Sequence, residues 1–151
     1  MNLLDIGCGN GRDSLYFASK GHLVTGIDSA SVERPPILAN PSFIQGDALS
    51  ELPSADSIYA RWFLHVLNDA EAATLLVLMA KSVRPGGLIF LEFRTSLSGL
   101  KQDHYRHEKN RTDIERFLCH LGMTVDVSVE GQGFSKVGDD DPRLARIVAI
   151  R

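Results

Sequence analysis

Short apolar segments alternate with amphipathic segments along most of the chain. Apolar runs predict strands at 3–6, 23–27, 43–45, 58–60 and 88–93. Hydrophobic residues recur at helical spacing in 12–20, 68–83 and 112–121, which predicts three helices. Strands that alternate with helices indicate an α/β domain, in which helices cover both faces of a mostly parallel sheet.

The end of the chain has a different pattern. Val125, Val127 and Val129 alternate with polar residues, as in an antiparallel strand with one half-buried face. A last apolar strand is predicted at 146–150, with no helix between the two. We therefore expect an antiparallel hairpin at the carboxyl terminus.

Two capping-box spacings mark the expected starts of the second and third helices. Asn68 stands three residues before Glu71, and Thr112 stands three residues before Glu115. In such a box the first side chain accepts a backbone N–H of the first turn, and the acid returns the bond. The Pro-Gly-Gly sequence at 85–87 predicts a turn between the second helix and the fifth strand.

Length and composition restrict the class of protein. The chain has 151 residues, of which 44% are hydrophobic and 23% charged, and its net charge is −3. These values are typical of one globular domain, which we expect to span 1–151. No apolar run approaches the ~20 residues of a membrane helix. The first residues of the given sequence lack the pattern of a signal peptide, and its two cysteines make no disulfide framework. We expect a cytoplasmic protein that binds neither membranes nor nucleic acid.

Three glycines at alternate positions, Gly7, Gly9 and Gly11, connect the first strand to the first helix. A loop without side chains lets a ligand lie directly against the backbone. The start of the following helix offers free N–H groups, which suit a carboxylate or a phosphate. A turn that binds nothing would use glycine as freely, so this loop alone leaves both interpretations open.

Two acids at the ends of neighbouring strands favour ligand binding. Asp28 closes the second strand, where a carboxylate can accept hydrogen bonds from ribose hydroxyls. Asp47 follows the third strand and is placed to meet an adenine amino group. The carboxyl ends of parallel strands meet at one edge of a sheet, so we expect both acids to lie beside the glycine loop.

With these motifs in place, the whole chain resembles the class I S-adenosylmethionine-dependent methyltransferases. Asp5 and the alternating glycines match the first motif of that family, and Asp28 matches its second-strand acid. Its acid before the adenine pocket corresponds to Asp47. Its segment after the fourth strand resembles 61–67, and its turn into the fifth strand resembles 84–87.

The resemblance implies a Rossmann-like, doubly wound sheet of seven strands with the last strand inserted antiparallel. It implies S-adenosyl-L-methionine as methyl donor and S-adenosyl-L-homocysteine as product. The residues that it places at this cofactor are Asp5, Gly7, Gly9, Gly11, Asp28, Asp47, Ala48 and Phe63. Methyl transfer is an in-line displacement, so catalysis would consist mainly of alignment.

Catalytic residues are expected after the fourth and fifth strands. His65 lies just past the fourth strand, near where this family places its substrate; the alternative is a helix-start histidine that bonds backbone. The long connection at 95–111 is expected to form a lid, with a solvated loop as the alternative. His104, Tyr105 and Arg106 lie in it. Of these, Tyr105 and Arg106 are the residues expected to contact substrate.

The expected acceptor is a small molecule or a sugar that is methylated on oxygen. Arg61, Trp62 and Phe63 stand where methyltransferases that flip DNA bases carry an Asn-Pro-Pro-Tyr-like motif, so nucleic acid is not expected as substrate. The segment 104–146 resembles methyltransferases associated with bacterial surface-glycan assembly. No metal is expected, because the three aspartates at 139–141 predict an acidic turn.

Two other functions stay open. One is a methyltransferase-like module that binds the cofactor or a partner without turnover. The other is an NAD-dependent Rossmann oxidoreductase, whose G-x-G-x-x-G loop would require a glycine where Arg12 stands.

The first predicted strand starts almost at Met1. Members of the family usually carry helices before this strand, and these helices help to shape the substrate site. The given chain has no such helices before the strand, so we expect either one domain of a longer protein or a minimal methyltransferase with an open site. A second copy of the chain, in a homodimer, or a partner domain would cover that site.

Overall fold

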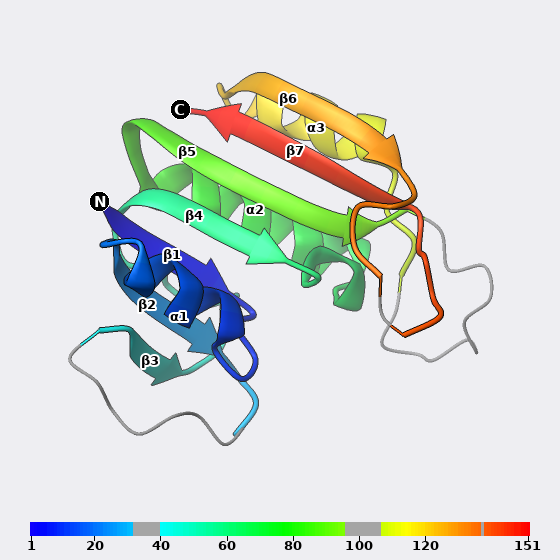
Figure 1. Cartoon of the computed structure of the whole chain (residues 1–151). Helices are drawn as coiled ribbons and strands as arrows, with labels where there is room; N and C mark the ends of the chain where they lie inside the picture. The colour runs from blue at the N-terminus through cyan, green and yellow to red at the C-terminus, as the bar shows by residue number, and fades with distance from the viewer. Residues whose placement is uncertain (32–39, 96–106, 137) are drawn as a thin grey trace.

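The computed structural model describes residues 1–31, 40–95, 107–136 and 138–151. Within these ranges the chain forms seven β-strands, three α-helices and one short 3₁₀ helix (Figure 1). In chain order they are β1 (Asn2–Ile6), α1 (Arg12–Ser19), β2 (Leu23–Asp28), β3 (Ser42–Gln45), β4 (Ala55–Arg61), η1 (Leu64–Val66), α2 (Asp69–Ser82), β5 (Val83–Arg94), α3 (Arg111–His120), β6 (Thr124–Gly131) and β7 (Leu144–Ile150).

All seven strands belong to one sheet, in the order β3-β2-β1-β4-β5-β7-β6 (Figure 1). β1 to β5 pair in parallel, and β7 is inserted antiparallel between β5 and β6. The expected seven-stranded α/β sheet with an antiparallel carboxyl-terminal hairpin is confirmed. The strand order changes direction between β1 and β4, which is where open α/β sheets bind ligands.

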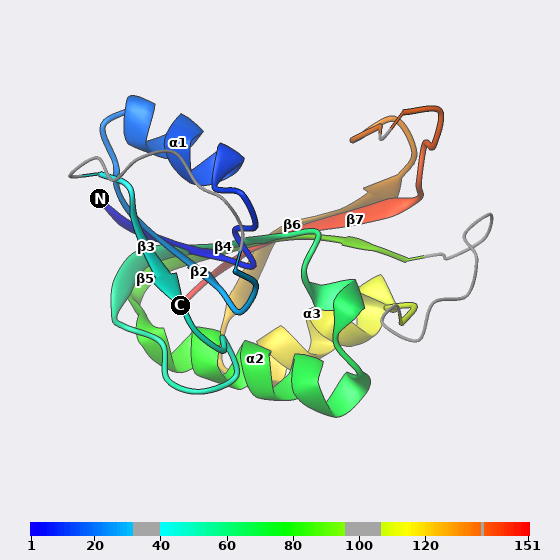
Figure 2. The same cartoon turned by 90° about the horizontal axis from the view of Figure 1, so that it is seen from below.

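Helices lie on both faces of the sheet (Figure 2). α1 covers one face, where Phe17 packs edge-on against Tyr59 of β4 with ring centres 5.0 Å apart. α2 and α3 cover the other face, and there Leu75, Met79 and Leu118 are completely buried. Helices on both faces explain why the central strands are almost continuously apolar.

β5 begins earlier than its apolar run. Val83 already pairs with Ala55 of β4, and the register shifts before the rest of the strand pairs. The Pro-Gly-Gly sequence at 85–87 lies inside this irregular start, so the separate turn predicted there is wrong. A side chain at Gly87 would come within 2.5 Å of the Asp56 carbonyl oxygen. The glycine is required by this close approach of two backbones.

β6 departs from the predicted alternation. A register shift between Val125 and Val127 inserts an extra residue, Asp126, opposite β7. Val125 packs against the core beside α3, whereas Val127 and Val129 pair with Val148 and Arg146 and are 39% and 43% exposed. The expectation of one half-buried valine face is therefore wrong, because a bulge moves every later side chain to the opposite face.

One of the two predicted capping boxes is present. The Asn68 side chain accepts the N–H of Glu71 at 2.9 Å, and the Glu71 carboxylate accepts the N–H of Asn68 at 2.8 Å. At α3 the cap is Asn110, whose side chain accepts the N–H of Asp113 at 3.1 Å. Thr112 lies inside the first turn of α3, so the box predicted from that residue is wrong.

The free energies of unfolding of two variants distinguish Asn110 from Thr112 as the cap of α3. We expect Asn110→Ala to lower the free energy of unfolding by about 1 kcal/mol, because a first-turn N–H loses its acceptor. Thr112→Ala should stay within about 0.5 kcal/mol of wild type, because this exposed side chain caps nothing. Urea unfolding of both variants measures the difference. A larger loss in Thr112→Ala than in Asn110→Ala would contradict the assignment.

Candidate active site

The glycine loop leaves β1 at the carboxyl edge of the sheet and leads directly into α1 (Figure 1). Gly7, Gly9 and Gly11 all have left-handed backbones, with φ of 70°, 51° and 79°. The N–H groups of Gly7 and Cys8 donate to the Ile27 carbonyl of β2 at 2.8 and 3.3 Å. The loop is therefore held against the neighbouring strand and not only by its own turn.

The three glycines are required for different reasons. A side chain at Gly7 would come within 2.4 Å of the Phe63 ring, and one at Gly11 within 2.5 Å of the Phe43 ring. At Gly9 no atom of the described residues lies within 4 Å of the position that a side chain would take. Gly7 and Gly11 thus satisfy packing, whereas Gly9 leaves open space above the loop.

The two strand-end acids lie at the same edge of the sheet. Asp28 accepts the N–H of Gly9 at 2.8 Å with one oxygen and the N–H of Ala30 at 2.8 Å with the other. It therefore ties the glycine loop to the end of β2. Asp47 is exposed and accepts the N–H of Leu49 at 2.8 Å.

Asp5 differs from these two acids because its carboxyl group lies inside the domain. It is 3% exposed and accepts the Ser14 hydroxyl of α1 at 2.6 Å. Burial raises the pKa of Asp5 to about 6, although the hydrogen bond from Ser14 acts in the opposite direction. In this structure Asp5 joins β1 to α1 beneath the loop.

A polar pocket of about 290 Å³ adjoins the glycine loop, and we call it the glycine-loop pocket. Its lining comes from the loop, α1, the end of β4 and the β6–β7 connection: Gly7, Cys8, Asn10, Arg12, Asp13, Arg61, Trp62, Ser135 and Lys136. Arg61 joins three of these segments, because its guanidinium donates to Asp13 at 3.1 Å and to Ser135 at 2.8 Å.

Sequence reasoning missed Asp13, Arg61 and Ser135 as parts of one site. The three residues are far apart along the chain and form no motif. In the sequence, Arg61 carries no signal beyond its place in the segment 61–67. Asp13 carries no signal beyond its place in the first turn of α1.

The predicted catalytic residues fall in two groups. His65 lies in η1 and is 4% exposed, and its Nδ1 accepts the backbone N–H of Arg94 at 3.3 Å. Such a hydrogen bond is what the alternative interpretation of His65, a histidine that bonds the backbone, predicts. A catalytic role for His65 stays a prediction. His104, Tyr105 and Arg106 lie outside the described residues.

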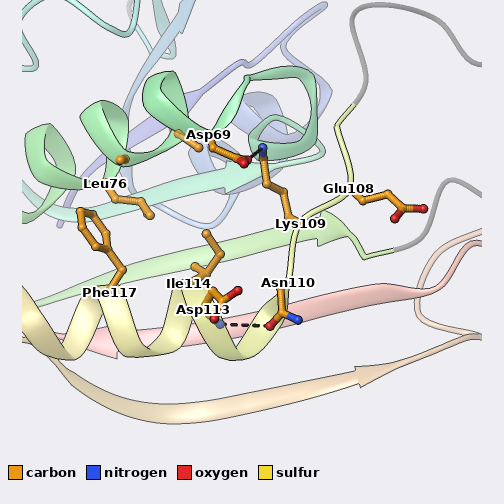
Figure 3. Close-up of a pocket in the computed structure, with 10 residues that line it drawn as sticks. Asp69, Leu76, Glu108, Lys109, Asn110, Asp113, Ile114 and Phe117 are labelled. Atoms are coloured by element: carbon orange, nitrogen blue, oxygen red, sulfur yellow. Dashed lines mark hydrogen bonds and ion pairs between the residues drawn. The ribbon is translucent and has the colours of Figure 1, made fainter.

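A second pocket, of about 360 Å³, lies between α2 and α3 (Figure 3). Leu76, Ile114 and Phe117 line its apolar part. At its rim the almost completely buried Lys109 donates to the Asp69 carboxylate at 2.7 Å and lowers the pKa of that acid. This pocket lies on the face of the sheet that α1 does not cover, away from the glycine loop.

Comparison with known proteins identifies the family. The family model described as "Methyltransferase domain" matches residues 3–87, more than half of the chain, including the glycine loop and both strand-end acids. The chain belongs to the class I S-adenosylmethionine-dependent methyltransferases. S-adenosylmethionine is the cofactor of this family, and the family match favours it over a dinucleotide.

Individual relatives are distant. Tabersonine 16-O-methyltransferase of Catharanthus roseus is 27% identical over 125 residues, which cover 75% of this chain and 33% of that protein. A SAM-dependent methyltransferase of Methanosarcina mazei superposes with a TM-score of 0.79 at 20% identity, over 99% of this chain and 92% of that one. The chain spans between 24% and 36% of the length of these curated relatives.

A third neighbour was solved with ligands. The 1,6-didemethyltoxoflavin-N1-methyltransferase of Burkholderia thailandensis, solved with bound 1,6-didemethyltoxoflavin and S-adenosylhomocysteine, has a TM-score of 0.77 at 21% identity. The alignment covers 99% of this chain and 70% of that one. In the described part of this methyltransferase domain, no helix is long and apolar enough to cross a membrane.

Gly9 offers a test of whether the loop serves a ligand. We expect Gly9→Val to weaken binding of S-adenosylhomocysteine at least tenfold, or about 1.4 kcal/mol, because the side chain enters the open space above the loop. Gly21→Val is the matched control: Gly21 also has a left-handed backbone, with φ of 86°, and open space around it. Calorimetry measures affinity and thermal unfolding measures the fold. Equal loss of affinity in both variants would contradict a ligand role for Gly9.

Asp5 predicts a pH dependence of stability. Its folded-state pKa of about 6 lies above the ordinary value of 3.8, so the folded chain binds this proton more tightly than the unfolded chain. The stabilisation is complete below pH 4 and is lost as the pH rises to about 6. Relative to Asp5→Asn, wild type should lose about 2 to 3 kcal/mol across this window in urea unfolding. Parallel stability curves for the two proteins would contradict the assignment.

Proposed function

We propose that this methyltransferase domain transfers the methyl group of S-adenosylmethionine to an oxygen of a small-molecule or sugar acceptor. The observation that carries the proposal is the glycine-loop pocket, which adjoins the left-handed glycines and contains groups of both charges. The amino-acid end of the cofactor carries an ammonium and a carboxylate. A pocket with both charges fits such a group.

The adenosine end is proposed to lie across the carboxyl ends of β2 and β3. A carboxylate oxygen that accepts one backbone N–H can accept a second donor. Asp28 therefore keeps the capacity to bind ribose hydroxyls, and Asp47 keeps the capacity to bind the adenine amino group. Ala48, which is buried, and Phe63, which packs over Gly7, would supply apolar surface.

The amino-acid end is proposed to lie in the glycine-loop pocket. The Asp13 carboxylate would accept hydrogen bonds from the ammonium group of the cofactor. Gly11 is the N-cap of α1 and has no side chain that could accept the first-turn N–H groups. Asn10 accepts the N–H of Arg12 at 3.3 Å, and Asp5 accepts the N–H of Ser14. The N–H of Asp13 and the exposed Arg12 side chain would therefore bind the carboxylate.

S-adenosylmethionine, when bound, supplies a methyl group on a sulfonium that leaves as a neutral thioether. The chain would contribute alignment of the acceptor, and a hydroxyl acceptor also needs a base. His65 and His104 stay the predicted bases, and Tyr105 and Arg106 the predicted substrate contacts. His65 accepts a backbone N–H at Nδ1, so when neutral it carries its proton on Nε2. It would have to release the N–H of Arg94 before acting as a base.

Oxygen as acceptor atom is supported by the curated relative from Catharanthus roseus, which is named as an O-methyltransferase. A nitrogen acceptor has support from the N1-methyltransferase among the fold neighbours. The sugar acceptor rests on the resemblance of 104–146 to glycan-assembly methyltransferases. We also propose a homodimer or a partner domain, because Val127 and Val129 are exposed on the face of the sheet that α1 only partly covers.

The cofactor and the acceptor atom are tested in sequence. Calorimetry with S-adenosylmethionine, S-adenosylhomocysteine and NAD should give binding of both sulfur compounds and none of NAD. Acceptor pairs that differ only in a hydroxyl or an amino group, such as 4-hydroxybenzoate and 4-aminobenzoate, are then assayed for S-adenosylhomocysteine release. We expect release with hydroxyl members only.

Asp28→Asn should weaken binding of S-adenosylhomocysteine about tenfold, because a carboxylate is the stronger acceptor for ribose hydroxyls. Asp126→Asn, on the exposed bulge of β6, is the matched control and should bind normally. Preference for NAD would overturn the proposal. Cofactor binding without turnover of any pair would favour the binding-module alternative.

A further inference from the structure

Trp62 has a backbone conformation that a bulky residue rarely adopts. Its φ is 59°, and it is the one non-glycine residue with a left-handed backbone in the described ranges. Such a conformation costs roughly 1–2 kcal/mol relative to an ordinary one. Interactions with the surrounding structure must therefore hold Trp62 in place.

Glu92 of β5 holds both ends of Trp62. The backbone N–H of Trp62 donates to the Glu92 carbonyl at 2.8 Å, and the indole Nε1–H donates to the Glu92 carboxylate at 2.7 Å. The backbone bond fixes where the turn leaves β4, and the side-chain bond fixes the rotation of the ring. Together they define one orientation of the indole.

The Glu92 carboxylate is itself held from two neighbouring strands. Arg61 of β4 donates to it through Nε at 2.8 Å, and Arg146 of β7 donates through Nε at 2.6 Å. Glu92 is 6% exposed. A buried carboxylate with two guanidinium partners is held in one position, so it can serve as a fixed acceptor for the indole N–H.

The orientation brings Trp62 to the glycine-loop pocket, where it lines the wall together with Gly7. The Arg94 guanidinium lies 4.9 Å from the centre of the indole ring, and the His65 ring meets it edge-on at 5.9 Å. These neighbours support the ring from outside the pocket lining. The strained turn therefore places Trp62 in the lining of a largely polar pocket.

We infer that Glu92 is a positioning residue, which holds the Trp62 indole against the ligand that occupies the glycine-loop pocket. The inference rests on the proposed function, which places the amino-acid end of the cofactor in this pocket. That end consists of methylene groups and a sulfur atom between its charged groups and the ribose. Aromatic rings make favourable contacts with both methylene and sulfur.

Trp62 is the single tryptophan of the chain, so it gives one indole N–H signal in a ¹⁵N-labelled sample. S-adenosylhomocysteine should shift this signal on binding to wild type. Adenosine lacks the amino-acid end and should leave the signal nearly unchanged. An indole signal that does not move with S-adenosylhomocysteine would overturn the inference.

Glu92→Gln tests the positioning role directly. We expect its affinity for S-adenosylhomocysteine to fall about fivefold, in line with the contribution of one aromatic contact, while its affinity for adenosine stays within about twofold. Glu130→Gln is the matched control. Like Glu92, Glu130 accepts hydrogen bonds from an arginine and from a second side chain, here Arg143 at 2.7 Å and Thr95 at 2.9 Å. Glu130 has no hydrogen bond to Trp62. Its affinities for both compounds should equal those of wild type.

Trp62→Gly provides a second route if Glu92→Gln folds poorly. Glycine adopts the left-handed backbone without strain, so this variant removes the indole and keeps the turn. It should show the same selective loss of affinity for S-adenosylhomocysteine. Equal weakening of both compounds, or normal affinity for both, would overturn the inference alone. Failure of wild type to bind S-adenosylhomocysteine would overturn the proposed function as well.

Discussion

The parallel pairing of β1 with a strand on each side is the constraint on which the rest of the structure depends. β1 pairs with β2 and with β4, and from Leu3 to Ile6 it is buried. Parallel strands end at the same edge of a sheet. One edge of the sheet therefore brings together the glycine loop after β1, Asp28 at the end of β2 and Trp62 after β4. These residues are separated along the chain by other helices and strands.

Charged side chains then connect this edge across the sheet. Asp13 of α1, Arg61 of β4, Glu92 of β5 and Arg146 of β7 form a continuous chain of ion pairs. Burying a carboxylate is costly unless its partners are placed well, so such a chain is weak evidence for stability. Its clearest consequence is geometric: it fixes the turn after β4 and the wall of the glycine-loop pocket.

The two faces of the sheet are covered unequally. α2 and α3 cover one face, whereas α1 lies over the half of the other face that contains β1, β2 and β4 (Figure 2). In the described part of the chain no helix lies on that face over β6 and β7. The bulge at Asp126 adds to this surface by turning Val127 and Val129 toward it.

Local patterns determined the elements, the Asn68 cap and the glycine loop, because each depends on residues within one or two turns of chain. They also placed Asp28 and Asp47 at strand ends, and parallel topology then brought both acids to the loop. Only the tertiary structure decided that Asn110 caps α3, that β6 contains a bulge and that Asp13, Arg61 and Ser135 share a pocket. These features depend on which strands are neighbours and on the register of their pairing. The spacing of residues along the sequence determines neither of these. The partners of Glu92 lie on β4, on the turn that follows β4 and on β7. Only the assembled sheet brings these three segments to Glu92, so its contact with Trp62 could not be predicted from the sequence.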